Sequence, residues 1–150
     1  MTKPRTTRAA AAHASRRPPA HTVESAMLDV RSVWVSLGAL NAALAVGAGA
    51  FAAHGLRGRL DARAFEVFET GARYHMYHAL AMILAGALAS ATNGRAGTAG
   101  AIFQLGIVLF SGSLYALAIT GVRGLGAITP IGGVAFLAGW VYLAWVCRRG

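Results

Sequence analysis

Four long stretches without a charged side chain constrain the fold of this chain more than any other feature of its sequence. They cover residues 32–56, 74–94, 96–122 and 124–147. A helix needs about 20 apolar residues to cross the hydrocarbon layer of a membrane, and each stretch is long enough. We therefore expect four membrane-spanning helices.

The composition of the whole chain agrees with this expectation. Only 13% of the residues are charged, against about a quarter in a typical soluble domain. The stretches are rich in Ala, Leu, Gly, Val and Ile without the alternation that a membrane β-barrel requires, and a helix pairs its own backbone within one segment. The expected fold class is an all-α membrane protein with four transmembrane helices, in one domain over residues 27–150.

The first 26 residues differ from the rest of the chain. They contain mainly Ala, Thr, Arg and Pro and almost no large apolar side chain, so they cannot contribute to a core. We expect either a disordered basic tail or a mis-assigned start, with translation beginning at Met27. The two possibilities stay open at this stage.

The net charge of +9 raises the question of nucleic-acid binding. The Lys and Arg residues lie in the tail and beside the apolar stretches rather than in one patch, which is typical of membrane flanks. We expect no nucleic-acid partner. The partners expected are the lipid bilayer and a second copy of the chain or another membrane protein.

The same charges predict an orientation. With the N-terminus inside the cell, nine Lys and Arg residues lie inside and five lie outside. The excess of positive charge on the cytoplasmic side favours an arrangement with both termini inside. The expected location is the bacterial inner membrane, as a multi-pass protein.

An amphipathic segment connects the first two stretches. Asp61 has the position of a helix N-cap, and apolar side chains then recur every three or four residues up to the second stretch. Glu69 and Arg73 fall on the opposite, polar side. We expect this segment, residues 61–73, to lie at the membrane interface and to run into the second span.

Small and polar residues in the first span predict contacts between helices. Asn41 lies at mid-membrane depth and needs a hydrogen-bonding partner on another helix. Three pairs of small residues are spaced four apart, which lets helix backbones approach closely: Gly38 and Ala42, Ala43 and Gly47, Ala45 and Gly49.

The later spans carry further polar and small residues. Ser111, Ser113 and Tyr115 place hydroxyl groups where they can bond to their own helix or to a neighbour. At the start of the fourth span, threonine is expected to cap the helix and Pro130 to occupy its first turn. The adjacent residues Gly132 and Gly133 would allow close packing.

Four motifs together resemble a known family. The motifs are GAFAAHGL, FETGARYHMYHALA, LFSGSLYALAITG and ITPIGG, in this order. They resemble a small four-helix family of bacterial inner-membrane proteins of unknown function that includes YgdD and YwdK. Ala52, where that family usually has glycine, and His75, where it often has glutamine, depart from the pattern. The resemblance implies a multi-pass inner-membrane protein and implies no activity.

Three histidines are the most distinctive chemical groups outside the tail. If the second span begins near Tyr74, then His54, His75 and His78 lie on one side of the membrane at similar depth. Three imidazoles, with Glu69 nearby, could form a metal site. Histidine and tyrosine also suit the headgroup boundary as anchors, and we favour this structural interpretation.

Two functions from different classes follow. The favoured one is a structural or accessory membrane protein. The alternative is a small-solute or ion transporter or channel component, with a polar pocket near His54 and His78 that also includes Glu69, Arg73, Tyr74 and Ser113. The sequence contains no nucleophile–base pair, carboxylate dyad or convincing metal motif, so we expect neither an enzyme nor a cofactor.

Overall fold

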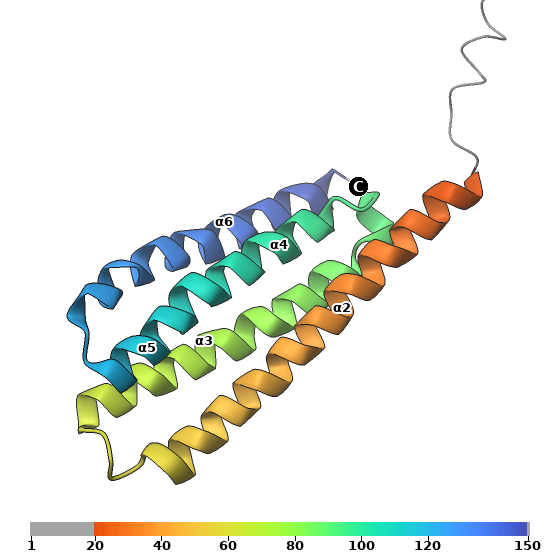
Figure 1. Cartoon of the computed structure of the whole chain (residues 1–150). Helices are drawn as coiled ribbons and strands as arrows, with labels where there is room; N and C mark the ends of the chain where they lie inside the picture. The colour runs from red at the N-terminus through yellow and green to blue at the C-terminus, as the bar shows by residue number, and fades with distance from the viewer. Residues whose placement is uncertain (1–19, 150) are drawn as a thin grey trace, which may run out of the picture.

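The computed structural model describes residues 20–149, and this part of the chain is helical and contains no strand. Four helical rods lie side by side, with the chain reversing direction between them (Figure 1). The rods are α2 (Ala20–Phe51), α3 (Ala62–Ala87), α4 (Ala96–Gly106) with α5 (Gly112–Thr120), and α6 (Thr129–Arg148). The π-helical turn η1 (Ala52–Leu56) extends α2, and a second π-helical turn, η3 (Ile107–Ser111), joins α4 to α5. The 3₁₀ turns η2 (Ser90–Thr92) and η4 (Arg123–Ala127) lie in the last two connections.

Residues with positive φ end the rods. Gly58 has φ 82°, Asn93 and Gly94 have φ 50° and 78°, and Gly121 has φ 70°. Glycine adopts this left-handed conformation without a steric penalty, and asparagine tolerates it better than most residues. Each of the three connections thus contains a residue suited to the reversal of the chain.

The first rod begins earlier than the composition predicted. Residues 20–26 belong to α2, although the sequence indicated disorder up to residue 26. This segment contains no glycine or proline, so nothing in it interrupts a helix that continues into the first apolar stretch. The rest of the tail, residues 1–19, lies outside the described residues, and the choice between a tail and a start at Met27 stays a prediction.

The amphipathic segment and the second apolar stretch form one helix. Asp61 is the N-cap, and its carboxylate accepts a hydrogen bond from the backbone N–H of Ala64 at 2.8 Å, as predicted. From there α3 continues without a break to Ala87. The predicted continuity with the second span is therefore confirmed, but Phe68 and Ala72 are buried against the bundle, whereas we expected residues 61–73 to lie at the membrane interface. Their apolar face is covered by neighbouring helices rather than left for lipid.

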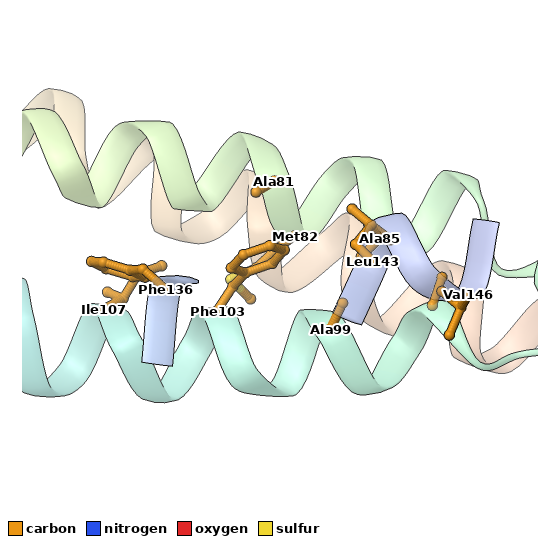
Figure 2. Close-up of a cluster of buried hydrophobic side chains, with 10 residues drawn as sticks. Ala81, Met82, Ala85, Ala99, Phe103, Ile107, Phe136, Leu143 and Val146 are labelled. Carbon is orange, nitrogen blue, oxygen red and sulfur yellow. The ribbon is translucent and has the colours of Figure 1, made fainter. Parts of the chain in front are cut away.

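Helix α3 occupies the centre of the arrangement. It packs along α2 on one side and along α4 and α5 on the other, while α6 packs against α4 and η3. The main core cluster joins α3, α4, η3 and α6 (Figure 2). Its members are Ala81, Met82, Ala85, Ala96, Ala99, Phe103, Ile107, Phe136, Leu143 and Val146. A second cluster of Ala52, Leu56, Phe68 and Ala118 fills the end of the bundle where α3 begins.

Glycines permit the closest approaches between rods. A Cβ atom on Gly38 would lie 2.8 Å from the backbone oxygen of Ala79, and one on Gly86 would lie 2.9 Å from the backbone nitrogen of Val35. The close approach predicted at Gly38 is therefore confirmed at the contact of α2 with α3. A Cβ atom on Gly47, in contrast, would have no neighbouring atom within 4 Å, so this small residue brings no helix close.

Three segments are long and apolar enough to cross a membrane: Leu28–Leu56, Ala96–Thr120 and Arg123–Arg148. Their outward side chains include many large apolar ones, such as Val134, Leu137 and Val141 of α6. Helix α3 is long enough as well, with 26 residues. Its first half carries four charged side chains and its centre carries two histidines and two tyrosines, which lower its mean hydropathy. The helix expected as the second span thus differs in composition from the other three.

Candidate functional site

The two histidines of α3 are both buried and point toward different neighbouring helices. His75 Nε2 lies 3.0 Å from Asn41 Oδ1 on α2, and His75 Nδ1 lies 3.2 Å from the hydroxyl of Tyr115 on α5. Asn41 also donates through Nδ2 to Gln104 Oε1 on α4, at 2.9 Å. We call Tyr115, His75, Asn41 and Gln104 the polar chain. It connects four helical segments through side chains alone, which confirms that Asn41 finds its partner on another helix.

The protonation pattern of the polar chain follows from one backbone contact. Asn41 Nδ2 donates to the carbonyl oxygen of Leu37 at 2.8 Å, and a carbonyl can only accept. The amide nitrogen of Asn41 therefore faces Leu37, and its oxygen faces His75. Consequently His75 Nε2 carries a hydrogen and donates it, and Nδ1 of the neutral ring accepts from the hydroxyl of Tyr115.

His78 has the opposite tautomer. Its Nδ1 lies 2.8 Å from the carbonyl oxygen of Tyr74, which accepts, so Nδ1 carries the hydrogen. The indole N–H of Trp140 donates to His78 Nε2 at 3.3 Å. Since an indole can only donate, Nε2 must be the bare nitrogen of a neutral ring. The two histidines thus use their ring nitrogens in reversed roles.

Aromatic rings surround His78. Its ring stacks on Phe136 of α6 with centroids 3.4 Å apart and planes 5° from parallel. Phe103 lies with its centroid 5.0 Å from Trp140, and Tyr74 lies 4.8 Å from Phe110. We call His78, Phe136, Trp140 and Phe103 the aromatic layer. It fills the space between α3, α4 and α6 just as the polar chain fills the space between α2, α3 and α4.

The hydroxyl groups of the third rod have different environments. Ser113 Oγ donates to the carbonyl oxygen of Phe110 at 2.9 Å, so at 2.8 Å it accepts from the hydroxyl of Thr129 on α6. Ser111 is fully buried, and its Oγ has no hydrogen-bonding partner among the described residues. Its position at the end of η3 places it where the helical hydrogen-bond register changes.

The start of α6 corrects one prediction and confirms two others. Ile128 is the N-cap, and Thr129 makes no capping hydrogen bond because its hydroxyl bonds to Ser113 instead. Pro130 lies in the first turn, as predicted. A Cβ on Gly132 would lie within 2.8 Å of the Cα of Phe110, so close packing is confirmed there. Gly133 has only ordinary contact distances, with Phe110 at 3.8 Å.

The histidines do not share one depth. His54 lies in η1 and is exposed, whereas His75 and His78 are buried. The prediction assumed that the second span enters the membrane near Tyr74. Helix α3 instead begins at Ala62, so His78 lies about 24 Å along the helix axis from Ala62. Among residues 20–149, no three His, Cys, Asp or Glu side chains are grouped in a way that could hold a metal ion.

Of the remaining members of the predicted pocket, Ser113 is buried against Thr129, and the other three are at the surface. Glu69, Arg73 and Tyr74 are exposed, and Arg73 donates to Thr70 Oγ1 at 3.3 Å on its own helix. The polar pocket expected around His54 and His78 is therefore not assembled by these side chains. Of the polar chain and the aromatic layer, only His78 was predicted as a member of the pocket. For Gln104 a signal was available, since it is an amide in an uncharged stretch like Asn41.

Comparison of the sequence with known proteins places the chain in a family. The family model described as "Protein of unknown function (DUF423)" matches residues 48–133, which include both buried histidines and Tyr115. The UPF0382 membrane protein YwdK of Bacillus subtilis is 51% identical over 113 residues, covering 74% of this chain and 92% of that relative. A UPF0382 membrane protein of Staphylococcus epidermidis is 51% identical over 111 residues, covering 74% and 91%. No solved structure matches the chain.

Proposed function

The chain belongs to the DUF423 family, whose function is unknown, and from this premise we propose a structural or accessory role in the bacterial inner membrane. The protein would be a non-enzymatic, four-span bundle whose partners are lipid and either a second copy or another membrane protein. The single observation that carries this proposal is the use of its central polar groups in contacts between helices.

These contacts leave few polar groups for a solute. His75, Asn41 and Gln104 bond to one another, and His78 bonds to Trp140. A transport path needs polar or ionisable groups that face a water-filled space within the bundle. Here both ring nitrogens of each buried histidine already have partners inside the protein. The arrangement supports a stable scaffold better than a conduit.

In this proposal helix α3 also crosses the membrane, as the second of four spans. Its 26 residues extend over about 39 Å, and the hydrocarbon core of a bilayer is about 30 Å thick. Crossing the core takes about 20 of these residues, so Glu66 and Glu69 lie near the headgroup region and the exposed Arg73 extends its long side chain toward it. Burial of its histidines against α2 and α6 lowers the cost of placing them in lipid.

The orientation in this proposal has both termini in the cytoplasm. Arg95, in the second connection, donates to the carbonyl oxygen of Arg149 at 3.5 Å, so that connection and the C-terminus share one end of the bundle. Their three arginines, with those of the N-terminal region, make this end the more positive one.

The natural cysteine offers a direct test of orientation. Cys147 is the only cysteine of the chain and is exposed. We expect a membrane-impermeant maleimide to label it only after cells are opened. A matched control carries Cys147→Ser and Gly124→Cys, which moves the thiol to an exposed position in η4 at the other end, and it should be labelled in intact cells. The reverse pattern would contradict the proposed orientation.

The role itself is tested by reconstitution. The full chain is placed in liposomes that contain a pH-sensitive dye or a small self-quenching dye. We expect proton and dye leakage no faster than in protein-free liposomes, because the central polar groups are paired. Faster leakage that Asn41→Leu abolishes would favour the transporter or channel alternative and overturn the scaffold proposal.

A further inference from the structure

A hollow of about 650 Å³ lies at the end of the bundle where α3 begins. It is bounded by the first turns of α3, by the end of α5 and by η4. Gly121, with φ 70°, ends α5 and turns the chain so that η4 closes one side. Sites that hold small ligands are about 300–1,000 Å³, so the space is large enough for a phosphorylated headgroup.

Two arginines from different elements border this hollow. Arg63 belongs to the first turn of α3 and Arg123 to η4, and both side chains are exposed. Within residues 20–149 neither guanidinium has a carboxylate partner. Asp61 also borders the hollow, but one of its oxygens is used to cap α3. The hollow therefore has a net positive charge that the protein itself does not neutralise.

The wall of the hollow changes character toward the middle of the bundle. Val67 lies one turn farther along α3 than Arg63, and Leu117 and Ala118 of α5 face it across the hollow. These side chains are half-buried or buried and apolar. Cationic groups at the outer end and apolar groups below them match the order of a phospholipid, with its phosphate above its glycerol and acyl carbons.

We propose that this hollow binds an anionic phospholipid of the membrane. The guanidinium groups of Arg63 and Arg123 hold the phosphodiester, because planar guanidinium donors match phosphate oxygens. Val67 and Leu117 contact the glycerol and the first acyl carbons. The site uses neither the polar chain nor the aromatic layer, so it does not depend on their role.

The test uses the full chain in neutral detergent micelles titrated with phosphatidylglycerol, and it measures the midpoint of thermal unfolding. A lipid that binds the native state raises this midpoint. We expect saturable stabilisation of the natural protein and an affinity about tenfold lower for the double variant Arg63→Gln with Arg123→Gln. Both positions are exposed, and circular dichroism checks that the variant keeps its helices.

The matched control is the double variant Arg57→Gln with Arg59→Gln. It removes the same charge at the same end of the protein from two exposed arginines that do not border the hollow. Its affinity for phosphatidylglycerol should stay close to that of the natural protein. An equal loss of affinity in both double variants would show that the lipid is attracted non-specifically by surface charge, and it would overturn the proposed site.

A third titration with inorganic phosphate separates the two sources of the anion. We expect no stabilisation, since free phosphate lacks the apolar part that contacts Val67 and Leu117. Stabilisation by inorganic phosphate equal to that by phosphatidylglycerol, lost in the Arg63 and Arg123 variant, would assign the hollow to a soluble anion and overturn the lipid proposal.

Discussion

His75 and His78 lie three residues apart on α3, yet polar side chains hold the first and aromatic rings hold the second. His75 bonds to Asn41 and Tyr115, whereas His78 stacks on Phe136 and accepts from Trp140. In lipid, packing and hydrogen bonds rather than expulsion of water hold helices together. Hydrogen bonds are the main interaction within the polar chain, whereas the aromatic layer combines hydrogen bonds with close packing of rings.

The two regions also differ in how they would respond to a second proton on the ring. The Tyr115 hydroxyl can donate or accept, so it could turn to accept from a protonated His75 Nδ1. The indole N–H of Trp140 can only donate, so a protonated His78 would set two N–H groups against each other. The polar chain is thus adaptable, and the aromatic layer permits one arrangement.

The largest effect is expected when the aromatic layer is broken. His78→Ala should lower the free energy of unfolding by about 3 kcal/mol, since it leaves a cavity beside Phe136 and an unpaired N–H on Trp140. Reversible unfolding by SDS in mixed micelles measures this change. Tyr77→Ala is the control, because Tyr77 lies one residue before His78 but is exposed. Similar losses in the two variants would contradict a packed aromatic layer.

An intermediate effect is expected when the polar chain is cut. Asn41→Leu should cost about 1–2 kcal/mol, because His75 Nε2 and Gln104 Oε1 both lose a partner and hydrogen bonds within membranes are individually modest. The same unfolding assay, applied to Asn41→Leu, His75→Leu and the double variant, tests the contact. The double variant should be more stable than the sum of the single losses predicts. Simple additivity would show that the two side chains are not coupled.

The smallest effect is expected for His75→Gln in the polar chain, and it is compared with the same substitution, His78→Gln, in the aromatic layer. His75→Gln should change the free energy of unfolding by less than about 0.5 kcal/mol, since an amide can donate to Asn41 and accept from Tyr115. His78→Gln should cost about 2 kcal/mol, because an amide cannot replace the ring that stacks on Phe136. Equal costs at the two positions would remove the distinction between the regions.

Local signals in the sequence predicted much of the fold. The uncharged stretches indicated the helical rods, Asp61 indicated the start of α3, and the lone amide of Asn41 indicated a contact between helices. Each of these signals depends on a residue and its near neighbours. Gly132 was also predictable from its own position, since the lack of a side chain there allows the backbone of Phe110 to approach the start of α6.

The contacts that could not be predicted depend on which helices become neighbours. The stack of His78 on Phe136 joins residues on rods that no local pattern pairs, and the hydroxyl of Thr129 prefers Ser113 to its own helix end. We predicted that the three histidines lie at similar depth, and this prediction was wrong. Helix α3 begins at Ala62, so His75 and His78 lie several turns from the end of the bundle where His54 is found. Gly47 shows that a four-residue spacing of small residues does not by itself predict a helix contact, since no atom lies within 4 Å of a Cβ placed there.

The central position of α3 has a consequence for how the chain is made. A ribosome completes α2 before α3, so Asn41, 34 residues earlier in the chain, is already present when His75 emerges. The partner of His78 is Trp140, which is synthesised 62 residues later. The least apolar helix therefore meets its neighbours at different times: His75 can bond to Asn41 on α2 first, Tyr115 on α5 follows 40 residues after His75, and Trp140 reaches His78 last.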